Sequence, residues 1–306
     1  MSAITYGFAR VRRRTGHPPR AVVVNSALLA DFAVTALIDE AHLTPKPALV
    51  DRRGCGAHAD LDLPTMLRSA NSLRGAFAAM ADAAFGQEPS RSLRETLAVI
   101  GREGERAMLA ATGGSNAHRG AIWVLGLLTA GVAMADADRT AGRIAARAAE
   151  VARYPDRFAP AGDSNGSRVC LRYGVAGARG EATSGFPHVA HIGLPALLVG
   201  RARGLAEEDV RLDVLMSLMA SLDDTCLLHR GGRAASTTAR RGARAVLEAG
   251  GASTAMGRQA LSRLDAKLLA LNASPGGSAD LLAAVLFLDR VGARPGRMPR
   301  PSSAWR

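Results

Sequence analysis

Cysteine is scarce in this chain of 306 residues. The three cysteines, Cys55, Cys170 and Cys226, are too few and too scattered for a disulfide framework or a CxxC metal site. Thiols that stay unpaired are typical of proteins in a reducing compartment. We therefore expect a cytoplasmic protein.

Long apolar runs are also missing. The longest, residues 121–135, has 15 residues, whereas a helix that crosses a bilayer needs roughly 18. Near the N-terminus, arginines precede an apolar segment in the manner of a secretion signal, but Asn25 and Asp31 interrupt it. The sequence therefore predicts neither a membrane span nor a signal peptide.

Acidic residues are absent from both ends of the chain. Residues 1–20 and 290–306 each carry five arginines and no acid, so that only +2 of the formal net charge of +12 belongs to the rest. A basic nucleic-acid-binding protein is thus an alternative that depends on the ends alone, and we expect no nucleic-acid partner. Residues 1–24 and 291–306 are predicted to be basic and disordered, and residues 25–290 to form one catalytic domain.

Sustained alternation of apolar and polar residues, the pattern of strands, does not occur. Apolar residues recur at helical spacing instead, and we predict an all-α, single-domain bundle of about ten helices with an active site built from loops at helix ends. Asn25 is expected to cap the first helix, and Ser92 with Glu95 to form a capping box for a later one. Further helices are expected from Pro64 to Ala84 and over residues 139–153, 206–222, 234–249, 253–272 and 281–289.

Walker A, GxGxxG and HExxH signatures are missing as well. A glycine-rich polar segment, TGGSNAHRG at residues 112–120, leads directly into the most apolar stretch of the chain. Backbone N–H groups at such a helix start can hold an anion such as phosphate. An ordinary polar helix start with a glycine turn explains the same pattern, and both readings stay open.

A second polar segment, residues 44–62, is long and irregular, which is typical of functional loops. Its carboxylates Asp51, Asp60 and Asp62 suit a hard cation such as Mg²⁺. The alternative is that Asp62 caps the helix that follows and that the other two are solvated.

Residues 174–195 form a third polar segment, in which Glu181 stands among small residues. Its alternative role is a surface acid paired with Arg179. His188 and His191 have a spacing that zinc ligands use, although the neighbouring proline and glycine argue against a zinc helix.

Two further segments, SLDDTCLLHRGG and SPGGSADLL, each join helix ends. Asp223 and Asp224 are predicted at the end of a helix, where the helix dipole disfavours negative charge unless a cation is present. Asp280 is expected to cap the last helix.

Taken together, five segments resemble the triphosphoribosyl-dephospho-coenzyme A synthase family, and its malonate decarboxylase branch more closely than its citrate lyase branch. They are TPKPALVDRRGCGAHADLD, TGGSNAHRGAI, GARGEATSGFPHV, DDTCLLHRGG and SPGGSADLLAAVLFL. The resemblance runs from about residue 25 to 290. In the second segment Ser115, Ala117 and Arg119 replace the valine, threonine and lysine that the family often has, which makes proton transfer at position 119 doubtful because arginine stays protonated.

The resemblance implies an enzyme that joins ATP to 3′-dephospho-coenzyme A, releases adenine and supplies the prosthetic group of the malonate decarboxylase acyl carrier subunit through a prosthetic-group transferase. The chemistry suggests Glu181 as general base, with Asp223 second, and His118 or His58 to assist the departing adenine. Phosphates and nucleotide are expected to contact Lys46, Arg53, Gly113, Gly114, Asn116, Arg119 and Arg230. Mg²⁺ that accompanies ATP is expected to contact Asp51, Asp60, Asp62 and Asp224. A Mg²⁺-dependent nucleotide or ADP-ribose hydrolase is the alternative enzyme.

Overall fold

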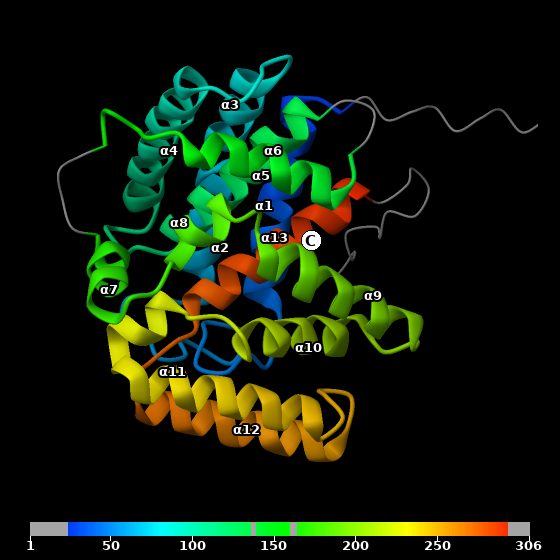
Figure 1. Cartoon of the computed structure of the whole chain (residues 1–306). Helices are drawn as coiled ribbons and strands as arrows, with labels where there is room; N and C mark the ends of the chain where they lie inside the picture. Colours follow the sequence, from blue (N-terminus) through cyan, green and yellow to red (C-terminus); the bar gives the residue numbers. More distant parts are fainter. Residues whose placement is uncertain (1–23, 136–138, 160–163, 293–306) are drawn as a thin grey trace, which may run out of the picture. The chain divides into compact units, whose positions relative to one another are not determined.

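The computed structural model describes residues 24–135, 139–159 and 164–292, and every regular element in these ranges is a helix (Figure 1). An isolated β-bridge joins Asp51 and Gly54. The prediction of an all-α fold is confirmed. Both predicted disordered ends fall, apart from their innermost residues, outside the described residues.

Thirteen α-helices and one π-helical segment make up the described part of the chain. Their bounds are α1 Ser26–His42, α2 Leu63–Ser72, α3 Arg74–Ala84, α4 Arg91–Ala111, α5 Arg119–Met134, α6 Ala141–Arg153, α7 Asn165–Tyr173, α8 Gly177–Thr183, η1 His188–Gly193, α9 Leu194–Ala202, α10 Glu207–Met219, α11 Thr225–Glu248, α12 Ala255–Ala270 and α13 Gly276–Gly292.

The count exceeds the ten expected because short helices occupy stretches for which no helix was predicted. The third polar segment contains α8, η1 and the start of α9, and α7 begins within the stretch before it. The helix predicted from Pro64 to Ala84 is divided at Leu73 into α2 and α3. The cap of α4 is Ser90, whose side chain accepts the N–H of Leu93, so the capping box predicted two residues later is wrong.

Helices α5 and α13 form the centre of the bundle. Nearly every side chain of α5 from Ala121 to Met134 is buried, as is most of α13, so both helices are covered on all sides. Helix α3 packs on α5, α1 packs on α13 and α3, and α10 packs on α13. Helices α11 and α12 lie side by side as a hairpin (Figure 1). At the N-terminal ends of these two helices His118 and Ser278 are buried, whereas Arg119 is exposed.

Polar caps fix where the helices begin. Asn25 caps α1 as predicted, and Asp62 caps α2 by accepting the N–H of Thr65 at 2.8 Å. Asp224 is the N-cap of α11 and does not end α10, which stops at Met219. The predicted conflict between Asp224 and a helix dipole is therefore wrong, because a carboxylate at a helix start is stabilised.

Helix α11 is kinked at Gly232, whose φ of 61° and ψ of −157° are not helical. Such a conformation favours glycine. The kink separates a first part, which contains Arg230, from a second part that starts at Arg233. Among the described residues, no helix is long and apolar enough to cross a membrane.

Candidate functional site

The N-terminal end of α5 meets Asp280, an acid in the second turn of α13. A Cβ added at Gly120 would stand 2.0 Å from Oδ2 of Asp280, so a larger residue there would have to displace the Asp280 carboxylate. The N–H of Ala121 also hydrogen-bonds to the Asp280 carboxylate, which helps to stabilise its charge. The inner N–H of this helix start is therefore directed at a carboxylate of the protein itself, and the predicted cap role of Asp280 on α13 is wrong.

Asp224 links the starts of α11 and α13. Its Oδ1 accepts the N–H of Cys226 at 2.9 Å and that of Gly277 at 3.2 Å, and its Oδ2 accepts both the N–H and the hydroxyl of Ser278, at 2.8 and 2.9 Å. The carboxylate is almost fully buried. One side chain thus binds the fourth polar segment to the fifth.

Glu40 and Lys46 form a buried ion pair beside this junction. Lys46 is 1% exposed, and its ammonium donates to the Glu40 side chain at 2.5 Å and to the Glu40 carbonyl at 2.7 Å. A lysine so enclosed does not have the exposure that a phosphate ligand requires, so the predicted role of Lys46 finds no support in this geometry.

Asp280 has an unusual electrostatic environment. Burial raises its pKa well above the ordinary value, and the negative charges of Glu40 and Asp224 raise it further. Part of the residue nevertheless stays open to solvent. A carboxylate with a raised pKa is a stronger base than an ordinary one, which makes Asp280 a candidate for proton transfer that the sequence reading missed.

His118, at the start of α5, is buried and neutral. Its Nδ1 lies 2.7 Å from the Ser69 hydroxyl, whereas its Nε2 has no hydrogen-bond partner among the described residues. Burial, with a smaller contribution from the charge of Lys46, lowers its pKa to about 3. His118 is thus a poor proton donor near neutral pH, although a neutral imidazole can still donate a hydrogen bond.

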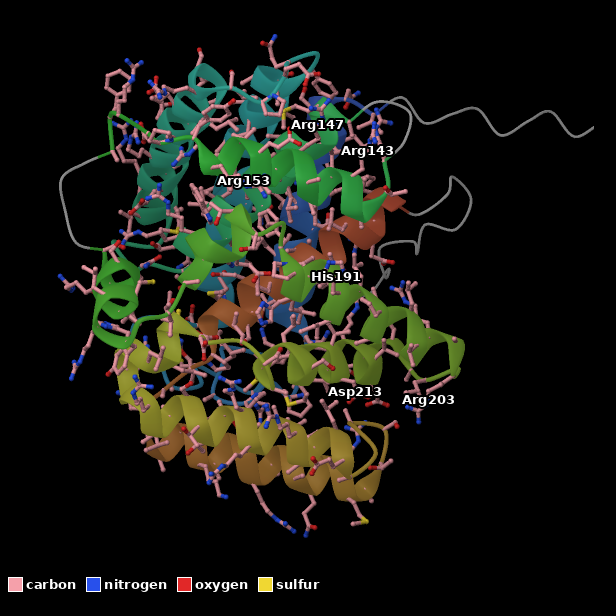
Figure 2. The ribbon with its side chains drawn as sticks, in the orientation of Figure 1. Arg143, Arg147, Arg153, His191, Arg203 and Asp213 are labelled. Atoms are coloured by element: carbon pink, nitrogen blue, oxygen red, sulfur yellow. The ribbon has the colours of Figure 1, made fainter. Side chains whose placement is uncertain are left out.

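Glu181 and His188 form a carboxylate–imidazole pair. Oε2 of Glu181 lies 2.7 Å from Nδ1 of His188, and Oε1 accepts the backbone N–H of His188 at 2.9 Å. The hydrogen bond to Glu181 is the main reason that the pKa of His188 is raised, and the Ser221 backbone and Asp223 raise it further. His191, labelled in Figure 2, is exposed and shares no metal cluster with His188.

Both carboxylate oxygens of Glu181 are therefore hydrogen-bonded to His188, and Glu181 is placed to orient the His188 ring. Asp223, the second base candidate, is exposed and pairs with Arg240 at 2.8 Å. A sequence signal for the pair did exist, since Glu181 and His188 stand seven residues apart in one polar segment.

The first polar segment approaches α11 through His58. Arg230 donates to the Ala57 carbonyl at 2.9 Å and lies 3.0 Å from Nδ1 of His58. Burial and the Arg230 charge lower the pKa of His58 to about 4, so His58 too is mainly neutral at pH 7. Contacts of this kind join the five polar segments in pairs, and the third reaches the fourth where Gly177 meets Thr225.

The four predicted metal ligands do not converge. The described ranges contain no group of three or more His, Cys, Asp or Glu side chains that could hold a metal ion. Asp51 accepts N–H groups from Lys46 and Arg53, Asp62 and Asp224 cap helices, and Asp60 is exposed. The metal role of these four aspartates therefore stays a prediction.

Arg53 and the glycine-rich turn have structural contacts of their own. The guanidinium of Arg53 donates to Asp51, to Asp265 on α12 at 2.6 Å and to the Lys46 carbonyl at 2.8 Å. Gly113 and Gly114 have φ of 67° and 98° and end α4, because Gly114 N–H donates to the Leu109 carbonyl. The phosphate roles of Arg53 and of the two glycines remain predictions.

Two pockets are lined in part by residues of the polar segments. One, of about 280 Å³, is lined by Asp223 and by arginines of α11. The other, of about 230 Å³, is lined by Arg119 and Trp123, and the guanidinium of Arg94 lies 4.9 Å from the Trp123 ring centre. Arg119 forms an ion pair with Glu105, and Asn116 accepts the N–H of Arg119 at 3.2 Å.

Arginine-lined pockets, an imidazole oriented by a carboxylate and a carboxylate of raised pKa are features that enzymes acting on phosphorylated substrates use. The sequence model of the ATP:dephospho-CoA triphosphoribosyl transferase family matches residues 26–297. The chain belongs to this family.

Relatives of similar length share more than half of their residues with it. A probable 2-(5''-triphosphoribosyl)-3'-dephosphocoenzyme-A synthase of Stutzerimonas stutzeri is 58% identical over 265 residues, which cover 86% of this chain and 91% of the relative. A probable synthase of the same name from Pseudomonas aeruginosa is 57% identical, with 90% and 92% covered. The Klebsiella pneumoniae synthase is 54% identical, with 86% and 94% covered. No solved structure matches the chain.

Proposed function

We propose that this protein joins ATP to 3′-dephospho-coenzyme A in the cytoplasm and releases adenine, giving 2′-(5″-triphosphoribosyl)-3′-dephospho-coenzyme A. The observation that carries the proposal is the meeting of the five family-like segments at one polar junction, within the range that the family model matches. The motif resemblance further suggests that the product serves the acyl carrier subunit of malonate decarboxylase, through its prosthetic-group transferase.

The reaction breaks the bond between ribose C1 of ATP and adenine. A hydroxyl of dephospho-coenzyme A attacks C1 from the opposite face, so the β linkage of ATP becomes an α linkage and the transition state has oxocarbenium character. The attacking hydroxyl loses a proton to a base, and adenine leaves more easily when an acid donates to a ring nitrogen.

Asp280 and His188 have the pKa directions that these two roles require. We assign the base to Asp280, because its raised pKa makes the carboxylate a stronger proton acceptor. We assign the acid to His188, because Glu181 raises its pKa and favours the protonated ring. His118 and His58 are left as hydrogen-bond donors in their neutral forms, since both have lowered pKa values.

Mg²⁺ remains part of the proposal as a companion of ATP. A triphosphate carries a high negative charge, and Mg²⁺ commonly binds substrate phosphates together with few protein ligands. Because the four aspartates form no cluster of three or more candidate ligands in the described residues, we expect Mg²⁺ to arrive as the ATP complex.

Product analysis tests the reaction. Purified protein, ATP, Mg²⁺ and 3′-dephospho-coenzyme A are expected to give adenine and a product whose mass equals both substrates less adenine. Adenine release should require dephospho-coenzyme A. Ribose triphosphate formed without that acceptor would instead identify the nucleotide hydrolase.

Glu181→Gln tests the role of His188 as the general acid. The variant removes the charge that raises the pKa of His188, so the imidazole loses its proton at lower pH. We expect the alkaline limb of the pH–kcat profile to move to lower pH, and turnover above that limb to fall about tenfold for each unit that the pKa drops.

Glu95→Gln is the matched control, because Glu95 is also a buried glutamate with an ion-pair partner, Arg157 at 2.6 Å. It should leave the alkaline limb in place. An unmoved limb in Glu181→Gln, with a folded protein, would exclude the role of the pair as acid.

A further inference from the structure

A pocket of about 280 Å³ lies on the second part of α11, after the kink. Four arginines line it together with hydroxyl groups and one acid; the lining includes Tyr173, Asp223, Arg233, Arg240, Arg241 and Arg244. Tyr173, at the end of α7, also contacts the Arg233 guanidinium, which lies 5.5 Å from its ring centre. The pocket therefore offers N–H and O–H donors and a strong positive potential.

Helical periodicity brings these arginines to one face. Arg233, Arg240, Arg241 and Arg244, with Thr237 between them, are related by spacings of three, four and seven residues, apart from the adjacent pair 240 and 241. Such spacings place their side chains on the same side of a helix. The face runs over the twelve residues from 233 to 244, or about 16 Å. Because the kink at Gly232 sets a new direction, Arg233 joins this row, whereas Arg230 before the kink contacts His58.

The positive charge of this face is largely uncompensated. Asp223 pairs with Arg240, but no acid of the described ranges forms an ion pair with Arg233, Arg241 or Arg244. Like charges three and four residues apart on a helix repel one another. An anion bound in the pocket would relieve that repulsion, and guanidinium groups suit phosphate oxygens in particular.

We propose that this arginine pocket binds an oligophosphate chain, and that it receives the triphosphate of ATP. The second part of the statement rests on the proposed function. The diphosphate of dephospho-coenzyme A is the other possible source, but the triphosphate has the larger negative charge and better matches four arginines against one aspartate. Asp223 connects the pocket to the reaction, since it lines the pocket and raises the pKa of His188.

Calorimetric titration of the full-length protein with inorganic tripolyphosphate, with pyrophosphate and with ATP tests the pocket directly. The test variant is the double variant Arg241→Gln with Arg244→Gln. If the double variant does not fold, each single variant is titrated in its place. The control is Arg143→Gln on α6, an exposed arginine remote from α11 in Figure 2. Steady-state kinetics then give KM for each substrate separately.

We expect the double variant to bind tripolyphosphate and ATP about 100-fold more weakly, roughly tenfold for each lost charged hydrogen bond. KM for ATP should rise, KM for dephospho-coenzyme A should stay within about twofold, and the control should match the parent. Unchanged tripolyphosphate affinity would overturn the proposal. So would a rise in KM for dephospho-coenzyme A alone, which would assign the pocket to the diphosphate.

Failure of the proposed function gives a different result. The parent could bind tripolyphosphate and ATP through these arginines but form no product with dephospho-coenzyme A. That result would support the oligophosphate pocket and contradict the transferase reaction. The two proposals are therefore tested separately.

Discussion

Asp280→Asn is expected to lower turnover by roughly 10² to 10⁴ and at the same time to make the protein more stable. Asparagine has the same shape and keeps an oxygen for the Ala121 N–H, but it carries no charge near Glu40 and Asp224. Loss of the base explains the slow reaction. Loss of a repelled, buried charge explains the gain in stability, which we expect as a rise of a few degrees in Tm.

The pH dependence of this gain follows from the direction of the shift. The folded-state pKa of Asp280 is raised, so the folded protein binds the proton more tightly than the unfolded chain, and stability falls as pH rises between the two pKa values. The Tm difference between Asp280→Asn and the parent should therefore be small at pH values below the unfolded pKa, near 4, and should grow as pH rises. Thermal unfolding across this range measures it. A lower Tm for the variant at neutral pH would contradict the assignment.

Gly120→Ala gives an independent check, because its Cβ would occupy the place of the Asp280 carboxylate. Gly142→Ala on α6 is the matched control, since its Cβ would meet open space. Alanine favours a helix in both positions by about 1 kcal/mol. Only Gly120→Ala should slow turnover, and equal activity in the two variants would separate Asp280 from the reaction.

Lys46→Met is expected to destabilise the protein by about 3–5 kcal/mol, or roughly 10 °C in Tm, because it leaves the Glu40 carboxylate buried without its partner. The ammonium of Lys46 makes two hydrogen bonds, both to Glu40. Methionine keeps the length of the side chain, so the loss would come from charge rather than from packing. Denaturant unfolding measures the change.

The double variant Glu40→Gln with Lys46→Met is the control. Removal of both charges should restore most of the stability, since a neutral pair in a buried site is often as stable as the ion pair. If Lys46→Met instead unfolds like the parent and raises KM for ATP, Lys46 is a phosphate ligand as its sequence context suggested.

Much of the fold follows from local pattern. The apolar stretch 121–135 predicts the buried helix α5, and Asn25 marks the start of α1. Helix α8 and η1 were missed because their glycine-rich sequences have weak intrinsic helix preference, and packing against other helices stabilises them instead. The local sequence of α8 and η1 does not show which helices they will pack against.

The site was predicted less completely, for a related reason. The five polar segments do meet, but the state of each side chain depends on neighbours far along the chain. Asp280 stands near a helix start and looks like a cap, whereas its pKa depends on Glu40 and Asp224. His118 looks like an acid, yet burial keeps it neutral.

Position 224 shows how closely architecture and reactivity are connected. Serine, threonine or asparagine would satisfy the N–H groups at the start of α11 almost as well as aspartate. None of them would supply the negative charge that strengthens Asp280 as a proton acceptor. A change at Asp224 is therefore expected to affect both the joining of the two helices and the proposed proton transfer at Asp280.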